Sequence, residues 1–261
     1  MMATTSEFYA AYARHRAAEG RAYTGAALRS LPYLRTGPLA TQWQVRARSF
    51  EAFVRHVLRP TGAGRLRVLD LGAGNGWLCN RLAGLGHEAV ALDIRDDTID
   101  GLGAAAEFQA DAASAFGRVV SSFDELPFES GRFDVAVFNA SVHYARELGR
   151  VLSEAVRVTR RGGVLVILDS PFYARDCDGK AMVDEKRARG AETFGASAGV
   201  LLSLGLVEYL TRARLSAASP DLTWSRRRVL YPLWYELRPL LARLRGRRPP
   251  SRFDLWMARV P

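Results

Sequence analysis

The sequence predicts an α/β protein with a doubly wound, Rossmann-like sheet, and two observations lead to that prediction. From Arg65 onward, short apolar runs alternate with helix-compatible segments, which is the pattern of buried parallel strands joined by crossover helices. In addition, a glycine-rich turn at Gly72 to Gly76 directly follows the first apolar run. Such a turn between a strand and a helix is typical of nucleotide-binding sheets. We therefore expect seven strands, mostly parallel with the last one antiparallel, helices on both faces and an N-terminal helical lid.

The elements follow in order along the chain. Five apolar runs are expected to be the parallel strands: LRVLDL, EAVALD, GRVVSS, FDVAVFN and GGVLVILD. Helices are expected over 76–85, 97–112 and 144–160, with Arg161-Gly162-Gly163 ending the last of them. Helical segments are then expected across 178–218, followed by an antiparallel pair formed by LTWSRRRV and FDLWMARV. Residues 231–251, between the two strands of that pair, are expected to project from the sheet edge as a short helix and loop.

The N-terminal region is expected to cover a ligand. Residues 6–20 and 41–58 have apolar side chains at helical spacing, namely Phe8, Tyr12, Phe50, Phe53, Val54 and Leu58. The segment between them is interrupted by prolines and suits a lid. A chain of 261 residues fits one domain. We divide that domain into a lid (1–60), a Rossmann-like core (61–220) and a C-terminal strand pair with a basic insert (221–261).

Composition says little about a partner. The formal net charge of +10 comes almost entirely from arginine, because Lys180 and Lys186 are the two lysines, and arginine-rich, GC-heavy genomes produce such a bias. Cys79 and Cys177 are too few for a disulfide framework and lack the grouped spacing of a zinc site. The N-terminus lacks a signal-peptide core and no run reaches the length of a membrane span. A cytoplasmic protein without a metal site is expected.

The glycine-rich turn predicts a nucleoside site. About 20 residues beyond it, Asp93 stands at the end of the second apolar run, which is the spacing of an acid that binds ribose hydroxyls. A dinucleotide fits less well, because Trp77 occupies the position of the last glycine of that motif. Asp70 also puts a carboxylate just before the turn, where a pyrophosphate would be repelled. A cationic ligand suits Asp70 better.

Several runs together resemble one family. VLDLGAGNGW resembles motif I of class I S-adenosylmethionine-dependent methyltransferases, and Asp93 matches the acidic residue of that family. Downstream, FDELPF, GRFD and VLSEAVRVTRRGGVLVILD are similar to the branch that contains ubiquinone-biosynthesis C-methyltransferases and many small-molecule methyltransferases. The resemblance spans about residues 65–170. It implies S-adenosyl-L-methionine as cofactor, S-adenosyl-L-homocysteine as product, and methyl transfer to O, N or C of a small molecule.

The resemblance also implies roles for individual residues. Asp93 would accept both ribose hydroxyls, and Ile94 would pack on the adenine. Ser122 stands where relatives have an aspartate for the adenine amino group, and Phe123 would offer its backbone amide. The carbonyl at Asn139 and Ala140 would meet the methionine ammonium. The loop residues that complete the cofactor-binding set are Gly72, Ala73, Gly74, Asn75 and Gly76, together with Asp70 before them.

His143 is the predicted catalytic base. It follows the fourth apolar run, and ligands of open α/β sheets bind beyond the carboxyl ends of the strands. An imidazole titrates near neutral pH, although a packing role in the pocket is equally open. Tyr144, Asp169 and Tyr173 are weaker candidates on the same face. From the lid, Tyr9, Tyr12, Tyr23 and Trp43 are candidates to cover the donor or the acceptor.

The acceptor stays open at the level of sequence. Asn139-Ala140-Ser141-Val142 differs from the Asp/Asn-Pro-Pro-aromatic motif of enzymes that methylate nucleobase amines, so a nucleic-acid substrate is the less favoured alternative. Another alternative is a donor-binding protein without methyl transfer, acting as a scaffold or a rearrangement catalyst. A specialised metabolite or a lipidic, prenylated compound is favoured. The basic insert, 226–252, interleaves arginines with leucines and is a candidate for contact with a membrane surface or an anionic substrate. The oligomeric state stays undefined.

Overall fold

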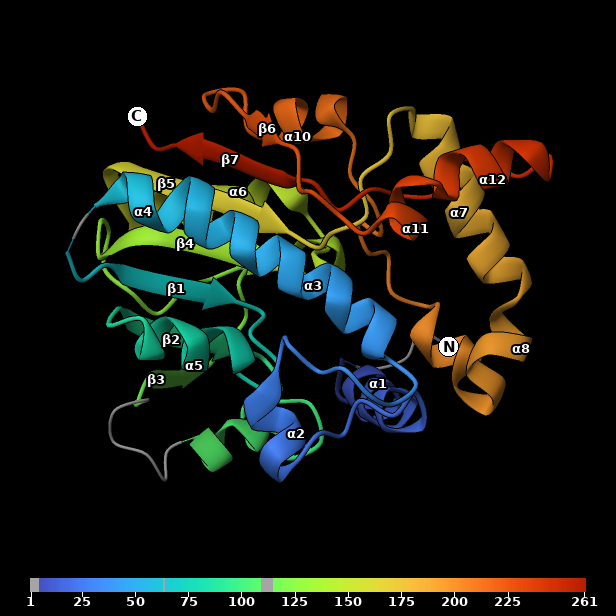
Figure 1. Cartoon of the computed structure of the whole chain (residues 1–261), viewed down its shortest axis with the longest axis horizontal. Coiled ribbons are helices and arrows are strands. Elements are labelled where there is room, and N and C mark those ends of the chain that lie inside the picture. The colour runs from blue at the N-terminus through green and yellow to red at the C-terminus, as the bar shows by residue number, and fades with distance from the viewer. Residues whose placement is uncertain (1–4, 63, 109–114) are drawn as a thin grey trace.

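The computed structural model describes residues 5–62, 64–108 and 115–261, and in this part of the chain a central sheet has seven strands (Figure 1). The strand order is β3-β2-β1-β4-β5-β7-β6. Strands β1 to β5 run parallel, whereas β7 is antiparallel to both β5 and β6. This arrangement confirms the predicted fold class. The strand bounds are Arg67–Leu71 (β1), Glu88–Asp93 (β2), Gly117–Val120 (β3), Phe133–Asn139 (β4), Thr159–Leu168 (β5), Ser225–Arg227 (β6) and Leu255–Arg259 (β7).

The central strands are apolar because helices cover both of their faces. Along β4, Val135 and Val137 join the hydrophobic cluster on one face, and Ala136 and Phe138 join the cluster on the other. The first cluster includes side chains of α3 (Ala40–Phe53) and α5 (Trp77–Gly84), and the second includes side chains of α6 (Leu148–Val158) and α10 (Arg212–Ala218). Because successive side chains along a strand point to opposite faces of the sheet, one strand contributes to the hydrophobic clusters on both faces.

The N-terminal helices are where the sequence predicts them. Helix α1 spans Thr5–Ala18, and α3 continues through a π-helical turn, η1 (Val54–Leu58), into α4 (Arg59–Thr61). Between them lies the short α2 (Gly25–Ser30). In Figure 1, α1 lies beyond the carboxyl ends of the strands, while α3 runs across the sheet. Helix α3 and the turn η1 pack directly on the core, since Phe53 of α3 and Val57 of η1 are fully buried.

The C-terminal third begins with helices at the carboxyl edge of the sheet. These are α7 (Asp176–Ala188), α8 (Gly190–Phe194), η5 (Gly195–Ser197) and α9 (Ala198–Leu201). Helix α9 packs on α1, where Leu201 joins Phe8 and Ala11. The predicted antiparallel pair is confirmed, with Arg226 opposite Trp256. Between its strands, α11 (Leu233–Glu236) and α12 (Arg238–Leu244) take the place of the one short helix expected. None of the helices in the described ranges is long and apolar enough to cross a membrane.

The helix predicted over 97–112 is wrong in its described part. Residues 98–103 form turns and a bend, and η2 (Ala104–Phe108) is a single 3₁₀ segment. The side chain of Asp97 accepts hydrogen bonds from the N–H groups of Ile99 and Asp100. An aspartate that binds backbone amides in this way stabilises a turn instead of a helix. Residues 109–112 of this prediction lie outside the described residues.

The predicted role of Arg161-Gly162-Gly163 is also wrong. Helix α6 already ends at Val158, and Thr159, which follows it, has an extended backbone with ψ 133°. The glycines lie inside β5, near a register irregularity between β4 and β5. Gly162 has a φ of +73° there, a conformation that favours glycine. The glycine pair therefore allows the irregular backbone near the start of β5 and does not end helix α6.

Candidate active site

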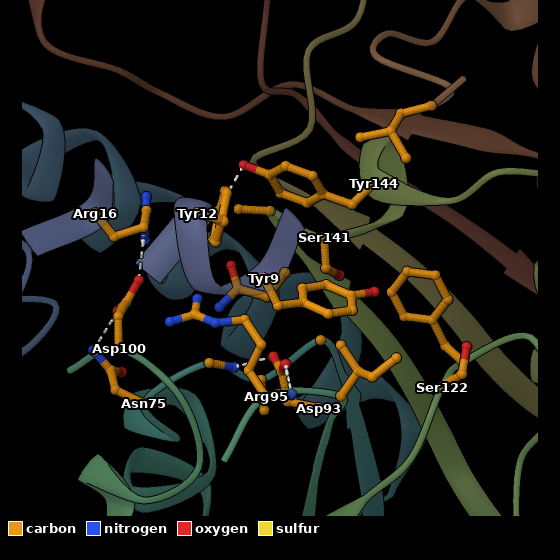
Figure 2. Close-up of a pocket in the computed structure, with 18 of the residues that line it drawn as sticks. Tyr9, Tyr12, Arg16, Asn75, Asp93, Arg95, Asp100, Ser122, Ser141 and Tyr144 are labelled. Atoms are coloured by element: carbon orange, nitrogen blue, oxygen red, sulfur yellow. Dashed lines mark hydrogen bonds and ion pairs between the residues drawn. The ribbon is translucent and has the colours of Figure 1, made fainter. Parts of the chain in front are cut away.

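A cavity opens where β1, β2 and β4 end, and α1 covers it (Figure 2). We call it the first cavity. Its lining includes ten of the residues predicted to bind the cofactor: Gly72, Ala73, Gly74, Asn75, Asp93, Ile94, Ser122, Phe123, Asn139 and Ala140. The sequence-predicted set is therefore brought together at one edge of the sheet, where open α/β sheets bind ligands.

The loop after β1 needs glycine for steric reasons. Gly72, Gly74 and Gly76 have φ values of +77°, +54° and +74°, which side chains disfavour. A Cβ on Gly72 would lie 2.5 Å from the Cβ of Ser141, and one on Gly76 would lie 2.9 Å from a ring carbon of Phe116. Gly76 does not line the first cavity but packs behind it, so its contribution is to fix the loop.

Asp93 connects the end of β2 to this loop. Its Oδ2 accepts a hydrogen bond from the Gly74 N–H at 2.8 Å, and its Oδ1 accepts one from the Arg95 N–H at 2.9 Å. Burial raises the pKa of this carboxyl above its usual range. A carboxylate oxygen can accept more than one hydrogen bond, so both oxygens keep capacity toward the cavity.

Two polar atoms beside the loop lack partners. Asp70 is completely buried and does not line the first cavity. Its Oδ1 has no hydrogen bond, and its Oδ2 lies 4.0 Å from the Cys79 Sγ. Burial, and then the charge of Asp93, raise the pKa of Asp70 well above its usual range. Asn139, at the end of β4, lines the cavity, and its buried Oδ1 is also without a partner. An unpartnered buried acceptor is costly, and the Asn139 oxygen, which faces the cavity, fits a ligand that donates a hydrogen bond.

Contacts from α1 close the first cavity. The Arg16 guanidinium donates to Asp100 at 2.6 Å, and the Asn75 amide donates to the other oxygen of Asp100 at 3.2 Å, so α1 is tied to the glycine loop (Figure 2). On another side, the Tyr12 hydroxyl donates to that of Tyr144 at 2.9 Å. Sequence reasoning missed Arg16 and Asp100, because no motif marks a pair 84 residues apart.

A second cavity adjoins the first, and Tyr12, Arg16, Arg46, Ala140 and Tyr144 line both. Further lining residues include His143, Asp169, Trp234, Tyr235 and Arg238. Of the weaker catalytic candidates, Tyr144 and Asp169 therefore face this cavity. Tyr173 lines neither cavity; instead its hydroxyl accepts a hydrogen bond from Arg248 at 3.0 Å.

His143 is held as a neutral imidazole. Its Nδ1 lies 3.4 Å from the Ser170 hydroxyl. Burial, followed by the charges of Lys186, Arg46 and Arg16, lowers the pKa of this histidine to about 3. The free imidazole lone pair is thus present at neutral pH, but its basicity is weak.

Asp169 faces the same cavity from the end of β5. Ser49 donates a short hydrogen bond to its Oδ1, and the hydroxyls of Ser49 and Tyr231 are 2.9 Å apart. The Oδ2 is buried without a partner. Burial raises the pKa of Asp169, and the Arg46 charge partly opposes that shift. The second cavity therefore holds two proton acceptors of different strength.

Known proteins share this domain. Residues 69–167 match the family model described as a methyltransferase domain. A ubiquinone/menaquinone biosynthesis C-methyltransferase of Rhizobium johnstonii is 31% identical over 115 residues, which are 43% of this chain and 44% of the relative. A ubiquinone biosynthesis O-methyltransferase of Bradyrhizobium diazoefficiens is 30% identical over 138 residues, 52% of each chain. The chain thus spans about half the length of the curated relatives it matches.

Solved structures share the fold. A 1,6-didemethyltoxoflavin-N1-methyltransferase of Burkholderia thailandensis, solved with 1,6-didemethyltoxoflavin and S-adenosylhomocysteine, is 16% identical, with a TM-score of 0.55 over 100% of this chain and 92% of that chain. An S-adenosylmethionine-dependent methyltransferase of Thermotoga maritima is 12% identical, with a TM-score of 0.58 over 97% and 100%. At these identities the likeness shows the fold alone.

Fold and domain match agree with the sequence prediction. Residues 69–167 match a methyltransferase domain and form part of a Rossmann-like sheet, and the chain is similar to class I S-adenosylmethionine-dependent methyltransferases. The cofactor of that class is S-adenosyl-L-methionine. In the described ranges, no group of three or more histidine, cysteine or acidic side chains is arranged to hold a metal ion.

The depressed pKa of His143 predicts a pH dependence of folding stability. The unfolded histidine, with a pKa of about 6.5, binds a proton below that pH, whereas the folded one stays neutral down to about 3. The free energy of unfolding should therefore fall as the pH drops from 6.5 toward 3. At pH 5 this one group accounts for a loss of about 2 kcal/mol. Urea unfolding at pH 7 and pH 5 measures it.

A His143→Gln variant supplies the control for that measurement, because glutamine does not titrate. Its loss of stability between pH 7 and pH 5 should be smaller than that of the wild type by about 2 kcal/mol. Equal losses in the two proteins would mean that His143 is charged in the folded state.

Proposed function

We propose that the protein transfers a methyl group from S-adenosyl-L-methionine, held in the first cavity, to O, N or C of a small-molecule acceptor in the second cavity. The observation that carries this proposal is the junction of the two cavities. Residues predicted to bind the donor line one cavity, the predicted base lines the other, and Ala140 at the end of β4 belongs to both.

The charges of the first cavity fit the amino-acid end of this donor. Asn139 offers an unpartnered acceptor oxygen, which suits the ammonium group. Arg46 borders the cavity and stacks over Trp43, with its guanidinium 5.1 Å from the ring centroid. In the described part of the chain it has no hydrogen bond or ion pair, and burial lowers its pKa. A partly desolvated guanidinium that is not directly paired with an anion is costly, so Arg46 suits the donor carboxylate.

The adenosine end has its own contacts in this proposal. Asp93 would accept the ribose hydroxyls, and Ile94 and Phe123 would flank the adenine. Ser122 is engaged elsewhere, because its hydroxyl donates to the Asp124 carboxylate at 2.9 Å and accepts from the Asp124 N–H at 3.2 Å. Asp124 also lines the cavity. It would supply, two residues further on, the carboxylate that relatives carry at the position of Ser122.

When bound, the donor supplies an electrophilic methyl group, so the protein has to align the nucleophile, exclude water and remove a proton where the nucleophile carries one. Tyr12 and Tyr144 would set the alignment, since their hydrogen-bonded hydroxyls stand where the cavities meet. His143 is the predicted proton acceptor. Its low pKa makes it a weak base on its own, and Asp169, with its unpartnered Oδ2, is the second candidate.

The acceptor is in our proposal a specialised metabolite or a lipidic, prenylated compound. Aromatic side chains of Trp234, Tyr235 and Phe253 line the second cavity and favour a ligand with apolar or planar parts. The Burkholderia neighbour was solved with 1,6-didemethyltoxoflavin bound. Residues 226–252 would contact the acceptor or the surface that supplies it. In this scheme residues 1–60 act as lid, 61–220 as core and 221–261 as the C-terminal strand pair with its insert.

We also infer a cytoplasmic location. Cys79 is a buried free thiol and Cys177 an exposed one, and exposed thiols persist in reducing compartments.

Transfer of a tritiated methyl group tests the proposed function. Purified protein, labelled donor and fractionated cell extract should yield label in the small-molecule or lipid fraction, and treatment with nuclease should leave that label unchanged. Label that disappears with nuclease would instead identify a nucleic-acid methyltransferase. If the protein binds S-adenosylhomocysteine but transfers no label to any fraction, it binds the donor without methyl transfer.

The role of Arg46 predicts the effect of a substitution on cofactor affinity. Arg46→Met keeps an unbranched, flexible side chain and removes the guanidinium with its charge, so the affinity for S-adenosylhomocysteine should fall about 10- to 100-fold, the usual worth of a charge-assisted hydrogen bond. The matched control is Arg48→Met, on the same helix, where Arg48 pairs with Glu51 at the surface. Isothermal titration calorimetry measures both. An Arg46→Met variant with wild-type affinity would remove Arg46 from the donor site.

A further inference from the structure

The insert between β6 and β7 presents an apolar helix face to solvent. The N–H of Leu237 donates to the carbonyl of Leu233, and that of Leu241 donates to Leu237, both at 3.0 Å, so α11 and α12 form one helical run. Its leucines at positions 233, 237, 240, 241 and 244 follow the spacing of a single helix face. All five are exposed, and Leu233 and Leu244 each keep 74% of their surface accessible. We call this the leucine face.

The leucine face differs from an ordinary solvated helix. Helix α12 has no buried residue, and α11 is attached to the core through Tyr235. Contiguous apolar surface of this kind is uncommon on soluble monomers and marks contact with a partner or a membrane.

Unpaired positive charge flanks the leucine face. Arg243, Arg245 and Arg247 are exposed and make no hydrogen bond or ion pair through their side chains in the described structure. Neighbouring arginines are already engaged, since Arg228 pairs with Glu236 and Arg248 with Glu185. The free cations therefore stand at one end of the leucine face, and an apolar helix face flanked by arginines is the composition of an interfacial helix.

We propose that the leucine face and these three arginines dock the protein on an anionic lipid bilayer. Leucines would enter the boundary between headgroups and acyl chains, while the guanidinium groups bind lipid phosphates. Trp234 and Arg238 line the second cavity, so docking would turn that cavity toward the lipid. This last consequence, an acceptor taken from the membrane, rests on the proposed function. The docking itself does not.

Other occupants fit this surface less well. A nucleic acid would pair with the arginines but leave five leucines in water, since it offers no apolar surface of matching size. A second copy of the chain would bury the leucines but bring the arginines of both copies together, at a cost of like-charge repulsion. An anionic bilayer offers apolar acyl chains to the leucines and phosphate groups to the arginines.

Vesicle binding provides the test, and Trp234 is a built-in reporter. Of the five tryptophans, Trp234 is exposed, while Trp43, Trp77, Trp224 and Trp256 are buried. The protein should sediment with vesicles that contain phosphatidylglycerol and at least tenfold more weakly with pure phosphatidylcholine vesicles. Its fluorescence should shift to the blue and be quenched by brominated lipid. In a Trp234→Phe variant the quenching should vanish while sedimentation persists.

Charge reversal with a matched control separates docking from general attraction. Arg243→Glu/Arg245→Glu/Arg247→Glu should weaken binding to the phosphatidylglycerol vesicles about 100-fold, at about a fivefold loss for each arginine near the surface. Arg55→Glu/Arg59→Glu/Arg65→Glu changes the net charge equally at the α4 end of the molecule, opposite α12 in Figure 1, and should have little effect. Equal losses in both variants would overturn the proposal.

The apolar part is tested in the same way. Leu233→Ser/Leu244→Ser should weaken vesicle binding about tenfold, whereas Leu85→Ser, at another exposed leucine, should not. A wild-type dimer in analytical ultracentrifugation that the leucine variant dissociates would overturn the proposal, as would displacement from vesicles by equimolar duplex RNA. All variants should bind S-adenosylhomocysteine as the wild type does, so a failure of docking is distinguishable from a failure of the proposed function.

Discussion

The hydrogen bond from the Gly74 N–H to the Asp93 carboxylate is the interaction on which the site depends. It joins the loop after β1 to the end of β2, and two further bonds, from the N–H groups of Gly72 and Ala73 to the Leu92 carbonyl, hold the bend in place. Three glycines take positive φ values, and the missing Cβ of Gly72 lets the loop backbone come close to Ser141, just after β4. The Asp93 carboxylate therefore both holds the loop in place and faces the first cavity.

Polar side chains that line the first cavity lack hydrogen-bond or ion-pair partners. The Oδ1 of Asn139 has no partner, and the Arg46 guanidinium makes no hydrogen bond or ion pair in the described structure. Each would be costly in a site meant to stay empty. Together they match a ligand that carries both a cationic and an anionic group, as the amino-acid end of S-adenosylmethionine does. The second cavity repeats this pattern, with a neutral His143 and an unpartnered oxygen on Asp169.

The sequence predicted features that depend on neighbouring residues in the chain, and it missed contacts between residues that are far apart in the chain. The glycine loop, Asp93 and the strand runs are readable because each depends on neighbours in the chain. By contrast, Arg16 meets Asp100 across 84 residues and Ser49 meets Asp169 across 120, and no spacing rule links such pairs. The expected helix at 97–112 is wrong because the Asp97 side chain binds nearby amides. Apolar spacing alone does not reveal that competition.

Calorimetric titration of S-adenosylhomocysteine into Asp93→Asn is the most direct test of the central claim. Asparagine has nearly the same shape but loses the charge and one acceptor oxygen, so both the loop and the ribose contact weaken. The account predicts at least a tenfold loss of affinity, with Asp96→Asn, an exposed neighbour, binding as the wild type does. Equal affinity of Asp93→Asn and wild type, or no binding by the wild type itself, would contradict it.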